Sequence, residues 1–286
     1  MRILTLLTLS ALFISGSAMA ATPKAAVLQR GTYLMEGVVA CGNCHIARGD
    51  KGQPLPEKGL SGGLVWDEPA FKAVASNITP DPETGIGKWT DAQLALAIRE
   101  GVRPDKSLIG PPMPMPFYRY LSDDDLAAII AYLRAQPAVK SAQPKPQYHR
   151  PLPPNYGPPV KSVKAPPASN QRAYGEYLAN IGHCMDCHSP RDEQGVLHLE
   201  YRGAGGQILT GPWGASVSRN LTPHPTGLKD FTDAQIIQSV REGVDRNGRH
   251  YNPPMGYAYY KTISDADMAA LIAYLRSLKP QTFGGK

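Results

Sequence analysis

Four cysteines occur in this chain of 286 residues, and all of them belong to two C-x-x-C-H motifs. The two thiols of such a motif can form thioethers with the two vinyl groups of one haem, and the adjoining histidine can bind its iron. The sequence therefore predicts two covalently attached haem c groups. The residues expected to hold them are Cys41, Cys44 and His45 in the first motif and Cys184, Cys187 and His188 in the second.

The motifs lie in two copies of one longer unit, which indicates a tandem duplication. The matching segments follow the same order in both copies. They include Asn77–Pro80 with Asn220–Pro223, Thr90–Gln93 with Thr232–Gln235, Arg99–Val102 with Arg241–Val244, and Ile130–Arg134 with Ile272–Arg276.

Two other uses of the cysteines fit this pattern less well. A pair of disulfides or a redox dithiol would leave His45 and His188 without a role. A zinc site built from both C-x-x-C pairs would have to join ligands from separate repeat units. Haem attachment accounts for all six residues together.

The ligand on the other face of each iron is expected to be a methionine. Pro-Met occurs at the same place in both copies, at Met113 and Met255, in a proline-rich loop before the last predicted helix. A thioether is a soft ligand that raises the reduction potential of the iron. The register of the repeat selects Met113, and Met115 is the alternative in the first copy. The competing interpretation is that these side chains only pack in the core.

Three helices per copy are expected to position these ligands. In the first copy, one helix ends at the cysteine motif. Another begins at Thr90, where T-x-x-Q is typical of a capping box, and ends near Gly101. The last begins at Ser122 and carries apolar residues at helical spacing. The corresponding positions in the second copy are Thr232, Gly243 and Ser264. No alternation of apolar and polar residues predicts a sheet, so the expected fold class is all-α.

The N-terminal residues 1–20 are interpreted as a secretory signal peptide. A basic residue precedes an apolar run, and Ala18-Met19-Ala20 fits a cleavage site. The alternative is an uncleaved membrane anchor. No later stretch is long and apolar enough for a transmembrane helix. We therefore expect a protein of the bacterial periplasm that has no transmembrane anchor after cleavage and can associate peripherally with a membrane complex.

The repeat also predicts the domain organisation. We expect a first domain at residues 27–136, a proline-rich linker at 137–169 and a second domain at 170–279, the linker being extended and semi-rigid. The two domains are expected to pack face to face about a pseudo-twofold axis, with the haems close together. The formal net charge of +6 arises from scattered lysines and arginines, which does not indicate a nucleic-acid partner.

Each half resembles a class I cytochrome c domain. Gly31 and Tyr33, like Gly175 and Tyr177, match the place where the first helix of that family crosses its last. The Asn-x-Thr-Pro segments and the run at residues 85–90 are similar to the multihaem cytochrome c subunits of periplasmic alcohol, aldehyde and gluconate dehydrogenases. Those subunits carry three such domains, and this chain has two. The resemblance implies an all-α fold of two tandem class I cytochrome c domains.

Three further residues are candidates for contacts with the haem propionates. Asn77, Asn220 and Trp89 could each donate a hydrogen bond to a buried carboxylate. The alternative for both Asn-x-Thr-Pro segments is a turn held by local side-chain bonds. The second copy has Phe231 where the first has Trp89, so the two haem environments are expected to differ.

Electron transfer without catalysis is the function that this pattern favours. No nucleophile or metalloprotease motif accompanies the haem motifs. The expected partners are redox proteins, namely a periplasmic dehydrogenase, a cytochrome or an oxidase. The alternative is an enzyme, a dihaem cytochrome c peroxidase. A peroxidase needs one iron with an open distal position, whereas both copies offer a methionine at the same place.

Overall fold

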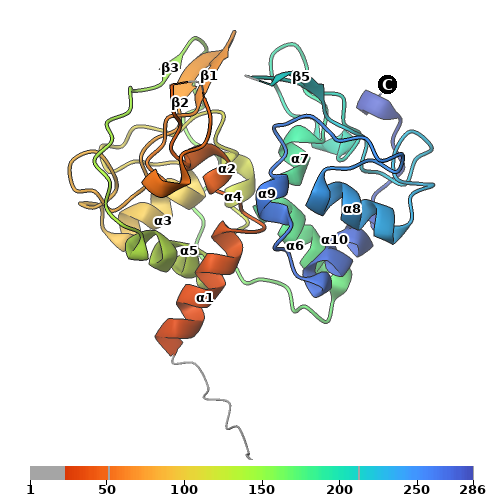
Figure 1. Ribbon diagram of the computed structural model, residues 1–286, viewed down its shortest axis with the longest axis horizontal. Helices are drawn as coiled ribbons and strands as arrows, with labels where there is room; N and C mark the ends of the chain where they lie inside the picture. The colour runs from red at the N-terminus through yellow and green to blue at the C-terminus, as the bar shows by residue number, and fades with distance from the viewer. Residues whose placement is uncertain (1–22, 51, 212, 286) are drawn as a thin grey trace, which may run out of the picture.

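The computed structural model describes residues 23–50, 52–211 and 213–285, and the predicted signal peptide lies outside them. The chain forms two lobes of similar architecture, one from each copy of the repeat (Figure 1). Buried apolar side chains from both lobes form one continuous cluster. Among the described helices, none has the length and apolar character needed to cross a membrane.

In each lobe the first helix crosses the last at a glycine. These helices are α1 (Pro23–Met35) and α5 (Asp123–Ala135) in the first lobe, and α6 (Gln171–Ile181) and α10 (Asp265–Ser277) in the second. A Cβ at Gly31 would lie 2.1 Å from the carbonyl oxygen of Ala128, and one at Gly175 would lie 1.8 Å from that of Ala270. No side chain fits in such a gap, so the two helices can approach this closely only because the residue is glycine.

The predicted capping signals are present at the middle helices. These helices are α3 (Asp91–Glu100) and α8 (Asp233–Glu242). Thr90 and Thr232 each form a capping box with the glutamine three residues on. Each helix ends at a glycine in the left-handed region, Gly101 with φ 70° and Gly243 with φ 68°. Local sequence therefore determines both ends of these helices.

The first helix of each lobe ends earlier than predicted. A residue with positive φ turns the chain before each cysteine motif, Ala40 (φ 49°) in the first lobe and His183 (φ 45°) in the second.

The motifs then form separate short helices, and another short helix follows each methionine loop. These are α2 (Gly42–His45), α7 (Cys184–Cys187), α4 (Met115–Tyr118) and α9 (Tyr257–Tyr260), with 3₁₀ turns at Pro56–Lys58, Leu199–Tyr201 and Phe283–Gly285.

Each lobe also carries a small antiparallel sheet, which the all-α prediction did not anticipate. The strands are β1 (Val65–Glu68), β2 (Phe71–Val74) and β3 (Gln147–Tyr148) in the first lobe, and β4 (Ile208–Gly211) and β5 (Gly214–Val217) in the second. Ile208 and Val217 are paired across the second hairpin, yet they are 70% and 53% exposed. The strands of this second hairpin have no buried face and leave no alternating pattern in the sequence, and those of the first lobe are only two to four residues long. The fold is helix-rich with some sheet.

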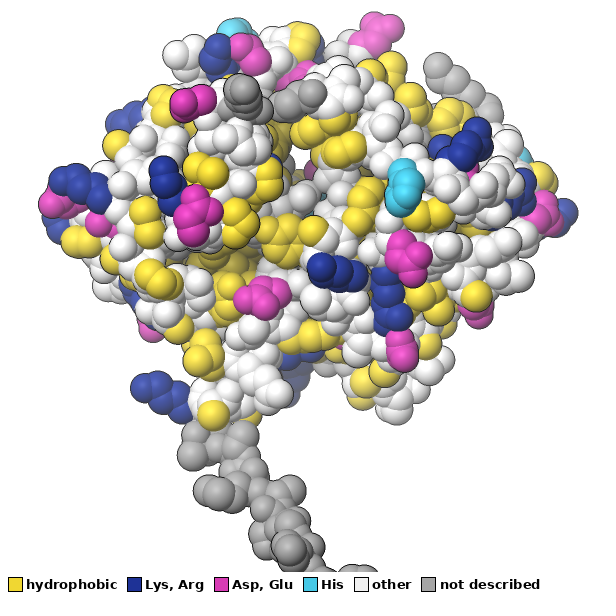
Figure 2. Space-filling view, viewed as in Figure 1, with side chains coloured by type: hydrophobic (Ala, Val, Ile, Leu, Met, Phe, Trp, Pro, Cys, Tyr) yellow, Lys and Arg dark blue, Asp and Glu magenta, His cyan; other side chains and the backbone are white. Residues whose placement is uncertain are grey.

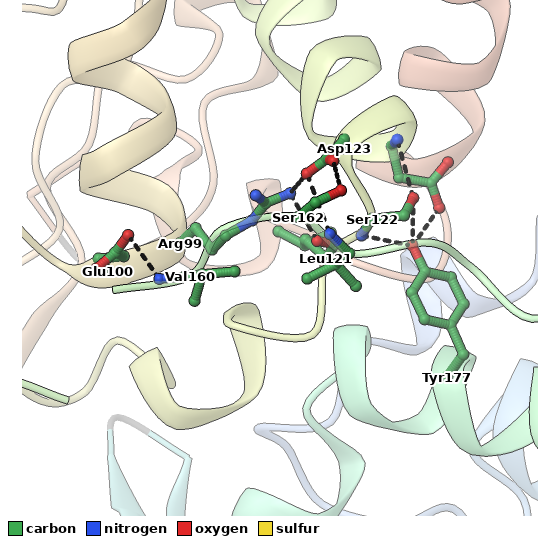
Figure 3. A network of polar contacts seen from close by, with 10 residues as sticks. Arg99, Glu100, Leu121, Ser122, Asp123, Val160, Ser162 and Tyr177 are labelled. Atoms are coloured by element: carbon green, nitrogen blue, oxygen red, sulfur yellow. Dashed lines mark hydrogen bonds and ion pairs between the residues drawn. The ribbon is translucent and has the colours of Figure 1, made fainter. Parts of the chain in front are cut away.

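Two equivalent tyrosines join the lobes. The hydroxyl of Tyr33 on α1 donates to the Asp267 carboxylate at 2.7 Å, and that of Tyr177 on α6 donates to the Asp125 carboxylate at 2.5 Å. Each tyrosine thus reaches the start of the last helix of the other lobe, as Figure 3 shows for Tyr177 beside Ser122. Reciprocal contacts of this kind define a two-fold interface. On the face drawn in Figure 2, hydrophobic side chains gather where the lobes meet.

The proline-rich segment after α5 lies along the first lobe. Its strand β3 pairs with β2, with Gln147 opposite Lys72. Farther along, the backbone N–H of Val160 donates to the Glu100 carboxylate at 3.2 Å, and the Ser162 hydroxyl donates to Asp123 at 2.6 Å (Figure 3). The segment is therefore attached to the first lobe at several points before it enters the second.

Candidate functional site

A backbone carbonyl orients the histidine of each cysteine motif. Nδ1 lies 2.8 Å from the Ser76 carbonyl oxygen in His45 and 2.7 Å from that of Arg219 in His188. Because a carbonyl only accepts, Nδ1 carries the proton and Nε2 keeps its lone pair for a metal. Burial lowers the pKa of both imidazoles, which favours the neutral form that binds iron.

The Asn-x-Thr-Pro turns position these two carbonyls. Ser76 and Arg219 directly precede Asn77 and Asn220, and each carbonyl lies 31 residues after its histidine. Sequence reasoning missed Ser76 and Arg219, because a backbone acceptor has no side-chain signature. The constant spacing between motif and turn in both copies is the signal that could have identified them.

The side chain of Asn77 is saturated by protein partners. Its oxygen accepts from the Thr79 N–H at 2.9 Å and the Thr79 hydroxyl at 2.7 Å, and its amide donates to the Thr84 hydroxyl at 3.1 Å and the Val139 carbonyl at 2.7 Å. Asn220 makes the equivalent four bonds with Thr222, Thr226 and Gln281. This is the pattern of the turn interpretation. A propionate contact stays a prediction, and it would require one of these bonds to open.

We expect Asn77→Ala to lower the free energy of unfolding by about 2 kcal/mol, because the buried Thr79 N–H would lose its partner and the Val139 carbonyl would lose one of its two hydrogen bonds. Urea titration measures this loss. Asn155→Ala is the control, since Asn155 is exposed and its side chain accepts one bond, from the Gly157 N–H. A shift in haem reduction potential without loss of stability would instead support the propionate contact.

The four motif thiols form no disulfide, and all are half-buried. Burial is the main cause that raises the pKa of Cys41 and Cys187 to about 12 and that of Cys44 and Cys184 to about 11. Redox-active dithiols depend on an accessible thiolate with a low pKa. This environment therefore gives no support to the dithiol interpretation.

The two cysteine motifs lie near one another across the junction of the lobes. A Cβ at Gly182, two residues before Cys184, would lie 3.0 Å from the carbonyl oxygen of Val38, three residues before Cys41. Asn43, inside the first motif, donates to the Pro254 carbonyl in the methionine loop of the second lobe at 3.0 Å. A Cβ at Gly42 would lie 2.3 Å from the hydroxyl of Tyr259 on α9. The second lobe thus packs directly on the first motif.

Two equivalent tyrosines lie in this region, Tyr118 buried and Tyr260 half-buried, and sequence reasoning missed both. Burial is the main cause that raises the pKa of Tyr118 on α4 and of Tyr260 on α9. The charges of the nearby motif cysteines raise both pKa values further. Tyr118 also meets the His183 ring edge-on, with centroids 6.0 Å apart. The matching aromatic pairs at residues 117–118 and 259–260 of the repeat could have identified them.

The methionine loops have the same backbone arrangement in both lobes. The Met113 carbonyl accepts from the Met115 N–H at 2.9 Å, and the Met255 carbonyl accepts from the Tyr257 N–H at 3.0 Å. Met115 and Tyr257 are therefore equivalent, and both pack against the glycine that ends the middle helix. Met115 is fully buried there, whereas Met113 and Met255 are half-buried. This favours Met113 over Met115 as a ligand, and iron binding by Met113 and Met255 stays a prediction.

Trp89 lies half-buried against the core, just before α3. Its carbonyl accepts from the guanidinium of Arg134, as the carbonyl of Phe231 accepts from Arg276 in the second lobe. The described contacts of Trp89 do not bear on a propionate, so that role also stays a prediction.

Residues 29–137 and 173–279 each match the sequence model of the cytochrome c family. The cytochrome c subunit of the quinone alcohol dehydrogenase from Gluconobacter oxydans is 32% identical over 287 residues, which cover 92% of this chain and 57% of the relative. One subunit of the nicotinate dehydrogenase from Pseudomonas putida is 30% identical over 269 residues, covering 89% of this chain and 22% of the relative. This chain thus spans only part of these relatives.

A third relative is of comparable length. The diheme cytochrome c-type protein of Cereibacter sphaeroides is 30% identical over 250 residues, which cover 82% of this chain and 81% of the relative. The donor set of each lobe, two unpaired thiols and one oriented neutral imidazole, fits the group that these similarities imply. The cofactors are two covalently bound haem c groups.

Proposed function

Because this chain belongs to the cytochrome c family, we propose that it carries electrons between a dehydrogenase, or the cytochrome partner of one, and a respiratory acceptor. The relatives that are cytochrome subunits of alcohol, fructose and gluconate dehydrogenases support a place beside such an enzyme. In this proposal the chain itself catalyses no reaction. Its haem domains span residues 27–136 and 170–279, and it works in the periplasm after residues 1–20 are removed.

The observation that carries the proposal is the proximity of the two cysteine motifs across the junction. Haem c supplies one-electron chemistry at its iron. The protein holds each group by two thiols and one imidazole. It keeps the imidazoles neutral through burial and aims them through the carbonyls of Ser76 and Arg219. The contacts of Tyr33 and Tyr177 fix the lobes, so electrons can pass between the two sites without a domain movement.

Ligand-binding spectroscopy of the haem-loaded full chain tests this function. We expect ferric visible and EPR spectra of two low-spin irons with histidine and methionine ligands, unreactive toward peroxide and, when reduced, toward carbon monoxide. We also expect rapid reduction of both haems by a quinone-dependent alcohol dehydrogenase supplied with ethanol. A high-spin iron that consumes peroxide would overturn the proposal and favour a dihaem peroxidase.

A further inference from the structure

The two methionine loops are covered differently, although they are copies of one another. Gly110, at the start of the first loop, is buried, whereas its counterpart Asn252 in the second loop is exposed. The cover over the first loop comes from the proline-rich segment that follows α5. We call residues 147–163 of that segment the strap.

The strap contacts Gly110 directly. The Gly110 N–H donates to the hydroxyl of Tyr148 at 2.9 Å. A Cβ at Gly110 would lie 2.6 Å from both Cε1 of Tyr148 and Cδ2 of Leu152. The Met113 N–H in turn donates to the Gly110 carbonyl at 3.3 Å, so a single residue links the strap to the methionine.

A second strap residue contacts the neighbouring position of the same loop. The Tyr156 hydroxyl donates to the Ile109 carbonyl at 2.7 Å. A Cβ at Gly101 would lie 3.0 Å from the Tyr156 ring and 3.3 Å from the methyl group of Met115. In the second lobe the corresponding place is filled from within the loop by Tyr251 and Tyr257, whose rings stack 6.4 Å apart.

The strap is anchored at both of its ends. At one end β3 extends the first sheet, and at the other Val160 and Ser162 bond to α3 and to the start of α5 (Figure 3). Displacing the first methionine loop therefore means breaking contacts with an anchored segment. The second loop has contacts from Ser216 to Pro253 and from Asn43 to Pro254, and both Asn252 and Pro253 remain exposed.

We propose that Tyr148 is a positioning residue for the distal methionine of the first haem, and that the strap makes opening of the first site to external ligands less favourable than opening of the second. This inference rests on the proposed function, in which Met113 and Met255 bind iron. Losing an axial thioether requires local opening of its loop, and each buried contact raises the free energy of that opening. An external ligand therefore enters at the second haem first.

Imidazole binding to the ferric, haem-loaded full chain tests the proposal, with Met113→Ala and Met255→Ala used to assign the spectra of the two haems. In the wild type we expect imidazole to replace the ligand of the second haem first. Tyr148→Phe is expected to raise the imidazole affinity of the first haem about fivefold, the effect of one lost hydrogen bond, and to leave the second unchanged. Tyr251→Phe is the matched control in the second lobe and should leave the first haem unchanged.

A second variant tests the same contact by another route. Gly110→Asn installs the residue of the second copy, and its side chain would displace Leu152 and Tyr148. It should change the first haem in the same direction as Tyr148→Phe. Equal changes at both haems, or a wild-type first haem that opens first, would overturn the proposal. If neither ferric haem shows the thioether charge-transfer band before imidazole is added, the ligand set of the proposed function fails, and this inference with it.

Discussion

Gly175→Ala should lower the free energy of unfolding by about 3 kcal/mol, at the upper end of the usual cost of overpacking. The added methyl group would lie 1.8 Å from the Ala270 carbonyl oxygen and 3.0 Å from Cβ of Tyr274. The first of these is backbone, so no rotamer change can relieve the clash, and α6 and α10 must move apart. The higher helix propensity of alanine returns only about 1 kcal/mol. Urea unfolding of the haem-loaded protein measures the difference.

Arg172→Ala is the control for this effect. Arg172 lies exposed on the first turn of the same helix, so the substitution tests alanine in α6 without the close approach. We expect a change within about 0.5 kcal/mol there. An unchanged stability in Gly175→Ala would mean that the two helices do not cross at this glycine.

The sequence predicted best those features that depend on neighbouring residues. The capping boxes at Thr90 and Thr232 and the left-handed glycines that follow each helix need only four or five residues to specify them. The helix crossing was also anticipated, through the resemblance and through Gly31 and Gly175. In each of these cases the repeat provided a second copy of the same signal.

Features that depend on distant residues were not predictable in the same way. Gly31 and Gly175 lie at the helix crossings as expected, whereas the hydroxyls of Tyr33 and Tyr177 bond across the junction to residues more than 50 positions away. The hairpin of the second lobe has exposed strands and no periodic burial pattern. The carbonyls that orient His45 and His188 belong to the backbone, and only the folded turns show where they point.

The second large loss of stability is expected for a substitution of Asp125. The carboxylate of this residue bonds to Arg30 of its own lobe and to Tyr177 of the other lobe. Its carboxylate accepts hydrogen bonds from Nε and Nη2 of the Arg30 guanidinium, at 2.8 and 2.9 Å. It also accepts one from the Tyr177 hydroxyl at 2.5 Å. Asp125→Ala removes all three bonds and leaves the arginine and the tyrosine without this partner. We expect a loss of about 3 kcal/mol in the free energy of unfolding, measured by urea titration.

Asp267 provides the matched comparison, because it is the same residue in the second copy. It accepts from the Tyr33 hydroxyl at 2.7 Å, and the position equivalent to Arg30 is occupied by Tyr174. Asp267→Ala should therefore lose about 1 kcal/mol, the value of one hydrogen bond. Equal losses at Asp125 and Asp267 would show that Arg30 adds nothing.

The pH dependence gives an independent measure of the same contact. Burial, followed by the charge of Asp125, raises the pKa of Tyr177 well above its usual value. A tyrosine whose pKa is higher when folded keeps its contribution below about pH 10 and loses it as the pH rises further. The wild type should therefore lose more stability between pH 9 and 11 than Tyr177→Phe does, as measured by urea titration at each pH. Other tyrosines titrate in both proteins, so only the difference between them reports on Tyr177.

Because Asp125 has more partners than Asp267, the last helices of the two lobes should differ in local unfolding. The last helix of the first lobe is held by Arg30 from its own lobe, by Tyr177 from the other lobe and by Ser162 of the strap. The equivalent helix in the second lobe begins at Asp265 and receives Tyr33 at Asp267. Hydrogen exchange should therefore be slower at the start of α5 than at the start of α10. Asp125→Ala should bring the exchange rates of the two helices close together. If the substitution leaves the exchange rate of α5 unchanged, this explanation is wrong.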